Sequence, residues 1–278
     1  MRSLRSGVSV ALCTVVDKRG SAPRDPGAKL AVIGDRVMGT LGGGEFERLV
    51  IEAAKEALRE GRPRLIKYSF REGGPPDAVS TGHLCGGEAD VFIDVLTPVP
   101  RLIIIGSGHV SLPVARIASV LGWRVVVVDD NPSTATRERF PEAEDIRVGE
   151  LSEELAKLNL TPSDLVFIAL GDAEKEYRVL KALVGTRVRY IGLLGSRKKG
   201  ATHLRRLKEE GVDLSPLKGI FHVPAGIDVG SDRPEEIAVS VVAEMLAVLK
   251  GATPSFMSIA DSVIESLERG EPVGTGTA

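Results

Sequence analysis

A cysteine in a glycine-rich setting is the residue of this chain best suited to chemistry. Cys85 is followed directly by Gly86 and Gly87, and His83 lies two residues before it. The thiolate is the reactive form of cysteine, and a nearby imidazole or cluster of backbone N–H groups favours it. The two glycines let a bulky ligand approach the backbone. The alternative is a buried structural cysteine, but the small polar neighbours favour a functional thiol.

The other cysteine, Cys13, lies inside an apolar strand pattern at residues 8–16. We expect it to be a core residue, because a free cysteine behaves as a small hydrophobic side chain. Two cysteines are too few for a disulfide framework. With only His83 and Cys85 close together, the sequence predicts no zinc-ligand set.

A glycine triplet precedes a predicted helix at residues 45–60. Free N–H groups and the macrodipole at a helix N-terminus favour an anion, and glycines let it come close. Glu45 and Glu47 are the candidate acid–base groups of this segment. The alternative is that both acids only stabilise the first turn of the helix. The three glycines are Gly42, Gly43 and Gly44.

A nucleotide-binding motif opens the second half of the chain, where a buried strand pattern runs into a glycine turn. Gly106 permits the tight turn, and Gly108 lets the backbone approach a pyrophosphate at the start of a helix. Asp129 stands 23 residues beyond Gly106, where a ribose-binding acid is expected. Ser111 replaces the third glycine of the motif, so the fold could bind NAD(P) or keep the motif as a scaffold. His109 either contacts a phosphate or is an exposed polar residue.

Two later segments also contain candidate site residues. Gly195, Ser196 and Arg197 follow a strand pattern and open a helix, so the turn could hold an anion with Arg197 as a bidentate donor. The alternative is a capped helix with solvated basic residues. Asp228 stands between two glycines with no evident structural need, and we consider it a possible site residue.

The elements that must position these residues follow from the hydrophobic pattern. The second half alternates strand and helix patterns, which predicts an α/β fold with a Rossmann-like doubly wound parallel sheet. We assign residues 99–278, including C-terminal helices, to this domain, and residues 1–98 to a smaller α+β domain. Strands are expected at 102–105, 124–128, 165–170, 188–194 and 219–223, and helices at 109–121, 152–158, 173–184, 198–210, 234–249 and 255–269.

Composition narrows the class of protein. The 278 residues have a net charge of −2, which gives no electrostatic case for nucleic acid. No apolar run approaches the roughly 20 residues that span a bilayer, and the N-terminus lacks the apolar region of a signal peptide, so we expect a cytoplasmic protein. Glutamine is absent, asparagine occurs twice and charged residues are abundant, a pattern that favours a thermophilic source.

Taken together, the motifs resemble the xanthine dehydrogenase accessory (XdhC/CoxI) family. The resemblance covers nearly the whole chain with its motifs in order, although many relatives have a cysteine where Glu45 stands and an arginine where Asn131 stands. The matching segments are residues 20–24, 26–29, 39–47, 85–87, 106–110, 190–197 and 224–244.

This resemblance implies an accessory protein that binds molybdenum cofactor (molybdopterin), protects it and helps to deliver its sulfurated form. The expected partners are an apo molybdenum hydroxylase, such as xanthine or CO dehydrogenase, a cysteine desulfurase and a second copy of the chain. Cys85 would contact the metal or the transferred sulfur. The alternative functions are an NAD(P)-dependent oxidoreductase using Gly106, Gly108 and Asp129, and an interaction scaffold that docks an apo hydroxylase through its surface.

Overall fold

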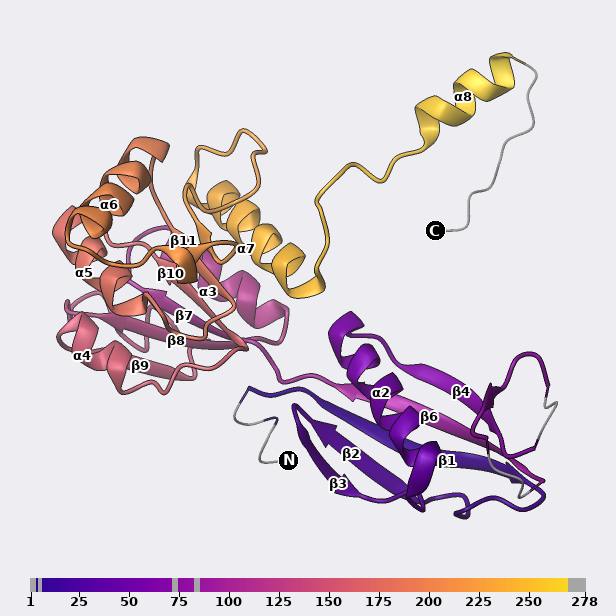
Figure 1. Cartoon of the computed structure of the whole chain (residues 1–278). Helices are drawn as coiled ribbons and strands as arrows, with labels where there is room; N and C mark the ends of the chain where they lie inside the picture. Colours follow the sequence, from indigo (N-terminus) through magenta and orange to yellow (C-terminus); the bar gives the residue numbers. More distant parts are fainter. Residues whose placement is uncertain (1–3, 5–6, 72–74, 83–85, 270–278) are drawn as a thin grey trace.

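The computed structural model describes residues 4, 7–71, 75–82 and 86–269, which form two six-stranded sheets (Figure 1). Sheet A has the order β3-β2-β1-β6-β4-β5, and its pairs are antiparallel except for β4 with β5. Its elements are β1 (Val10–Arg19), β2 (Lys29–Ile33), β3 (Arg36–Gly39), α2 (Gly44–Glu60), β4 (Arg64–Ser69), β5 (Val79–Ser80) and β6 (Glu88–Leu96).

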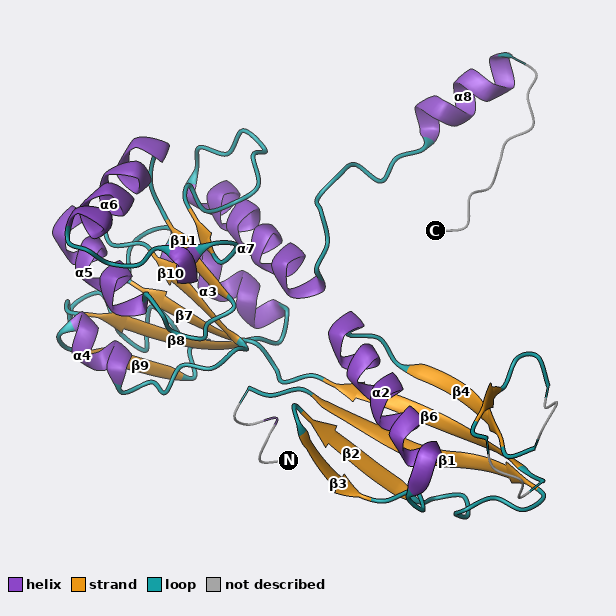
Figure 2. Ribbon diagram, viewed as in Figure 1, coloured by secondary structure: helices purple, strands orange, loops and turns teal. Residues whose placement is uncertain are grey.

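Helix α2 covers one face of sheet A because its apolar residues recur on one side (Figure 2). Phe46, Val50 and Ala54 are buried there with the inward-facing residues of the strands. Cys13 of β1 is completely buried, which confirms its expected place in the core. Burial raises the pKa of the Cys13 thiol to about 12, so this thiol is protonated and inert at neutral pH.

Sheet B has the order β12-β11-β10-β7-β8-β9, and all of its strand pairs are parallel. The chain builds β8 and β9 on one side of β7 and then crosses over to place β10 on the other. This is the doubly wound Rossmann order, and it confirms the predicted fold class. The strands are β7 (Arg101–Ile105), β8 (Arg124–Asp129), β9 (Asp145–Val148), β10 (Asp164–Ile168), β11 (Tyr190–Leu193) and β12 (Phe221–His222).

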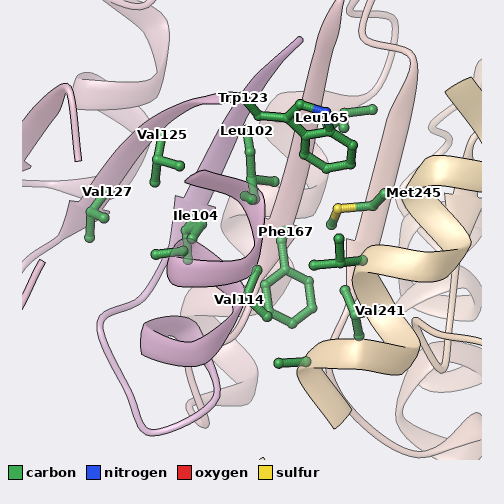
Figure 3. Close-up of a cluster of buried hydrophobic side chains, with 14 of the residues drawn as sticks. Leu102, Ile104, Val114, Trp123, Val125, Val127, Leu165, Phe167, Val241 and Met245 are labelled. Atoms are coloured by element: carbon green, nitrogen blue, oxygen red, sulfur yellow. The ribbon is translucent and has the colours of Figure 1, made fainter. Parts of the chain in front are cut away.

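Helices cover both faces of sheet B, so its central strands are apolar throughout. One face packs on α3 and α7, and Figure 3 shows Ile104 and Phe167 of the sheet beside Val114, Val241 and Met245 of these helices. The other face packs on α4, α5 and α6. The helices are α3 (Ser111–Val120), α4 (Leu151–Ala156), α5 (Ala173–Leu183), α6 (Arg197–Glu209) and α7 (Pro234–Lys250), with a 3₁₀ turn at Ser215–Leu217.

Most predicted elements shift by one or two residues at their ends, and two differ more, for physical reasons. The sequence pattern does not predict strand β9, because three of its four residues are partly buried, Val148 is exposed, and the strand carries little hydrophobic pattern at the edge of the sheet. The last helix, α8 (Ala260–Glu268), is shorter than the predicted 255–269. None of residues 260–268 is buried, and Figure 1 shows α8 standing away from both sheets. No helix in the described part of the chain is long and apolar enough to cross a membrane.

A spacer of four residues, Thr97–Pro100, joins β6 to β7 and contains two prolines. Proline-rich spacers are extended and semi-rigid, at roughly 3.1 Å per residue, so this one spans about 12 Å. The spacer follows the C-terminal end of β6. The segment Gly86–Gly87 precedes β6, so it lies at the opposite end of that strand.

The aromatic centre of sheet A gives a test of this packing. Phe46 contacts the rings of Tyr68 and Phe70 edge to face, with centroids 5.2 and 5.0 Å away. Phe46→Ala is expected to lower the free energy of unfolding by about 3–5 kcal/mol, because it leaves a cavity. Urea unfolding measures this change. Phe256→Ala is the control, because Phe256 is completely exposed; equal losses in the two variants would contradict the assigned core.

Candidate functional site

Three glycine segments that are far apart in the sequence meet at one end of sheet A. A Cβ atom on Gly87 would overlap the backbone of Ser21, and one on Gly42 would lie 2.6 Å from Cβ of Pro23. Only glycine allows these approaches. Segments 20–24, 42–44 and 86–87 therefore form one unit, which we call the glycine cluster.

Backbone hydrogen bonds fix the third segment of the glycine cluster beside the end of β4. Gly86 donates its N–H to Phe70 O, and Phe70 donates its N–H to Gly87 O, both at 2.9 Å. A Cβ atom placed on Gly86 or on Gly43 would meet no described atom within 4 Å. These two glycines therefore face open space, whereas Gly42 and Gly87 pack against the chain.

Glu47 holds the glycine loop in place. Its Oε2 atom accepts hydrogen bonds from Thr40 Oγ1 at 2.6 Å, Leu41 N at 2.8 Å and Gly43 N at 3.1 Å. Burial alone would raise the pKa of Glu47, but these bonds and the charge of Arg24 outweigh it and hold the pKa below its ordinary value. Glu47 is thus an ionised brace for the loop.

Of the two remaining candidates of this region, the structure describes Glu45 but not Cys85. Glu45 lies in the first turn of α2 and pairs with Arg48 on the same helix. This ion pair is partly exposed, which fits the structural role that we weighed against acid–base chemistry. Cys85 and its neighbour His83 lie outside the described residues, and the described residues that flank them are Gly82 and Gly86.

The glycine turn of sheet B is built by a close approach between two strands. A Cβ atom on Gly106, which has φ 106°, would overlap the carbonyl oxygen of Ala169 at the end of β10. Because β7 and β10 flank the point where the strand order reverses, this turn lies at the crevice where open sheets bind ligands. Gly108 and His109 are exposed on the outer part of the turn.

Asp129 is buried and braces this turn. Its Oδ2 atom accepts hydrogen bonds from Ser107 N and Ser107 Oγ, both at 2.6 Å, and Oδ1 accepts one from Asn131 N at 3.0 Å. Ser107 Oγ also lies 2.6 Å from Thr134 Oγ1. The expected ribose acid is therefore already engaged by its own chain, and its role toward a ribose stays a prediction.

The second turn, at residues 195–197, is a capped helix start. Ser196 accepts a hydrogen bond from Lys199 N at 3.2 Å, as predicted for a cap, and Arg197 is exposed. The side chain of Lys199 packs against Gly195, because a Cβ atom on Gly195 would lie 2.9 Å from Cδ of Lys199. Its ammonium group then reaches Glu176 Oε1 at 3.1 Å.

Glu176, which was not among the predicted site residues, is completely buried at the same edge of sheet B. Glu176 Oε1 also accepts a hydrogen bond from Gly171 N at 3.1 Å, and His203 Nε2 lies 3.5 Å from Oε2. A signal was present, because Glu176 occupies the apolar side of α5 three and four residues before Val179 and Leu180.

Glu244 was also not among the predicted site residues, and it holds the segment that contains Asp228. Glu244 of α7 accepts hydrogen bonds from Tyr190 Oη at 2.6 Å and Gly226 N at 2.9 Å, and His222 Nδ1 lies 3.1 Å away. Burial alone would raise the pKa of Glu244, but these partners outweigh it and hold the pKa below its ordinary value. Asp228 is exposed and accepts only a long bond from Gly230 N, at 3.4 Å, among its described contacts.

The structure thus collects the predicted residues into two groups rather than one. Gly42–Gly44 and Gly86–Gly87 lie at the far end of sheet A, and the turns at 106, 195 and 226 lie along the carboxyl edge of sheet B. Figure 1 shows the N-terminal end of α2 turned away from sheet B. Among the described residues, no group of three or more His, Cys, Asp or Glu side chains could hold a metal ion.

The Glu47 brace makes stability depend on pH. Its pKa in the folded protein lies below the ordinary value of 4.5, so its stabilisation is present above pH 4.5 and is lost as the pH falls through the folded pKa. Glu47→Gln is expected to reduce the free energy of unfolding by about 1–2 kcal/mol at pH 7, and by less at pH 3.5. Urea unfolding at both values measures this, with Glu52→Gln on the exposed face of α2 as control. A loss from Glu47→Gln that does not change with pH would contradict the brace.

Two protein-family models match this chain. The model of the XdhC Rossmann domain matches residues 102–245, and the model of the XdhC and CoxI family matches residues 3–69. A crystal structure described as a xanthine dehydrogenase from Bacillus halodurans has 20% sequence identity and a TM-score of 0.51, covering 94% of this chain and 97% of that chain. This similarity shows the shared fold.

Two curated proteins are related in sequence at more than 30% identity. The chain is 37% identical over 248 residues to "Uncharacterized protein YqeB" of Escherichia coli (strain K12), covering 89% of this chain and 45% of that protein. It is 33% identical over 174 residues to a probable xanthine dehydrogenase subunit of Bacillus subtilis (strain 168), covering 62% of this chain and 50% of that protein. It therefore spans about half the length of these two relatives.

A third relative is "Molybdenum cofactor insertion chaperone PaoD" of Escherichia coli (strain K12), which is 25% identical over 278 residues and covers 89% of this chain and 86% of that protein. The Rossmann-domain model alone covers just over half of the chain. The second model adds the region of the glycine cluster that precedes residue 70. The chain therefore belongs to the XdhC and CoxI family.

Proposed function

We propose that this protein is an accessory factor that binds molybdenum cofactor as cargo and passes it to an apo molybdenum hydroxylase. Membership of the XdhC and CoxI family and the relationship to a protein named as a cofactor insertion chaperone support this role. The client is a xanthine or CO dehydrogenase type of enzyme. Delivery of the sulfurated cofactor, a cysteine desulfurase as sulfur source and a homodimer belong to the same proposal.

The observation that carries the proposal is the convergence of the glycine cluster. The cargo is a wide pterin that carries an anionic phosphate, so it needs N–H donors and close access to the backbone. Gly43 and Gly86, on different segments of the cluster, give close access to the backbone, although their own N–H groups are bonded to Glu47 and Phe70. The 17-residue helix α2 begins at Gly44 with no side-chain cap on its N-terminal N–H groups, and its positive end favours the phosphate.

The proposed role of Cys85 is to bind the metal or its terminal sulfur. A thiolate is a soft ligand suited to such a centre. Its chain neighbour Gly86 is held in the glycine cluster by the bond to Phe70, which supports placing the cargo there. In this proposal Glu45 stabilises the start of helix α2 and Glu47 holds the glycine loop. The protein does not need to catalyse a reaction itself.

Sheet B favours a second candidate, the binding of NAD(P) in an oxidoreductase. The supporting observations are the Rossmann strand order and the Gly106 turn at the point where the order reverses. In this candidate, Gly108 and His109 contact the phosphates. The Gly195–Arg197 turn and Asp228 line the same edge.

The open glycine of the cluster provides one test. Gly43→Ala adds a methyl group on the proposed ligand side, and we expect it to weaken binding of molybdenum cofactor at least tenfold. Gly34→Ala is a matched control, because Gly34 also has positive φ and faces open space but lies in the β2–β3 turn. Anaerobic titration with purified cofactor measures both. Equal affinities in the two variants would remove the cluster from the binding site.

The two cysteines provide a second test. Cys85→Ser is expected to lower retention of molybdenum cofactor at least tenfold, because a hydroxyl group is a poor ligand for a soft centre. Cys13→Ser is the control, since Cys13 lies in the core with its thiol protonated. Retention is measured by molybdenum content after anaerobic gel filtration. Full retention by Cys85→Ser would show that the thiol does not bind the cargo.

A further inference from the structure

Helix α8 presents an apolar side to solvent, and Figure 1 shows it standing away from both sheets of its own chain. Ile264 and Leu267 are 53% and 63% exposed. An isolated helix of fewer than about 12 residues is marginal in water, and helices of this kind are stabilised by packing their apolar side. Helix α8 has nine residues, and those on its apolar side are spaced three or four apart: Ala260, Val263, Ile264 and Leu267.

The segment that connects α7 to α8, residues 251–259, works as a tether. Every one of these residues is exposed. When extended, the tether spans roughly 30 Å at about 3.3 Å per residue, whereas α7 itself is about 25 Å long at 1.5 Å per residue. The tether is therefore long enough to carry α8 to the surface of a second copy of the chain.

The outer surface of α3 and α7 has the matching apolar character. These two helices pack side by side on one face of sheet B (Figure 2). Arg116 is the only charged residue of α3, and Glu244 is the only one of α7 between residues 236 and 250. Glu244 is turned inward to Tyr190. We call the exposed apolar residues of this surface the α3/α7 patch: Val120, Leu121, Val239 and Leu246.

The charges beside α8 and beside the α3/α7 patch are opposite. Arg116 lies one helical turn before Val120, and Lys250 is the last residue of α7. Lys250 and Asp261 have no ion pair with any described residue. Opposite charges at the rim of a contact steer its partners and fix their register. Three acids lie in a row next to the apolar side of α8: Asp261, Glu265 and Glu268.

Sheet A has a second uncovered surface, on the face opposite α2, where Phe92 is exposed. Asp90 and Asp94 flank Phe92 on that face, because alternate residues of a strand point the same way. Lys67, on the same face, already pairs with Asp77. The acidic row of α8 would meet like charges there, so the charges favour the α3/α7 patch as the surface that receives α8.

We propose that α8 is a dimerisation arm, and that α8 of each copy packs on the α3/α7 patch of a second copy. The exchange is reciprocal, so the same contact is made twice, as in a twofold dimer. The repetition matters because a stable interface buries roughly 1,600 Å² in total, more than one nine-residue helix can cover. The inference rests on the homodimer of the proposed function and names its interface.

Sedimentation velocity of the whole chain over a range of concentrations tests this proposal. Ile264→Asp places a charge on the apolar side of α8, and Val120→Asp places one in the α3/α7 patch. Each is expected to weaken dimerisation at least tenfold. Ser262→Asp is the matched control, because it adds the same charge on the opposite side of α8, and it is expected to change dimerisation less than twofold. All three residues are exposed, and far-UV circular dichroism checks that each variant is folded.

A mixture of the Ile264→Asp and Val120→Asp chains distinguishes exchange between copies from packing within one chain. The mixture contains an intact arm and an intact patch on different chains, so it is expected to form a heterodimer, whereas each variant alone is monomeric. A mixture that stays monomeric overturns the exchange.

The remaining outcomes separate the arm from the homodimer itself. Leu65→Asp changes the exposed residue opposite Phe92 on sheet A and is expected to leave the dimer intact; loss of the dimer in this variant and not in Val120→Asp overturns the assigned surface. A dimer that persists in Ile264→Asp overturns the arm and leaves the homodimer in place. A wild-type chain that is monomeric at every concentration overturns both.

Discussion

Close approach of backbone at glycine is the constraint on which both groups of site residues depend. At Gly87 and Gly42 it brings segments about twenty to sixty-five residues apart into one cluster. At Gly106 it brings the first turn of sheet B against the end of β10. A side chain at any of these positions would push the loops apart, so both groups depend on the absence of a side chain at these glycines.

Such loops would be loose without partners for their N–H groups, and carboxylates supply those partners throughout the molecule. Glu47 accepts from Gly43, Asp129 from Ser107, Glu176 from Gly171, and Glu244 from Gly226. Each pairing satisfies a backbone donor with a charge-assisted bond. The repeated arrangement separates two roles: glycines let segments of the chain approach closely, and neighbouring acids hold the resulting loops in place.

Much of the fold follows from the local hydrophobic pattern of the sequence, whereas the carboxylate contacts that hold the loops do not. The alternation of apolar strands and amphipathic helices predicts the Rossmann sheet, and the apolar setting of Cys13 predicts its burial. Glu244 could not be assigned, because its partners Tyr190 and His222 lie 54 and 22 residues away. The meeting of Gly87 with Ser21 depends on the pairing of β1 with β6, a long-range choice that no local pattern encodes.

The order of β6, the spacer Thr97–Pro100 and β7 has a kinetic consequence. The glycine cluster precedes β6, and the Gly106 turn follows β7. The nine residues of β6 extend about 30 Å, and the stiff spacer adds to that separation. Across this separation, a molecule bound at the first group of residues does not reach the second group of the same chain. Transfer between the two groups therefore requires release into solvent or contact with a second chain, and only the second route is second order in protein.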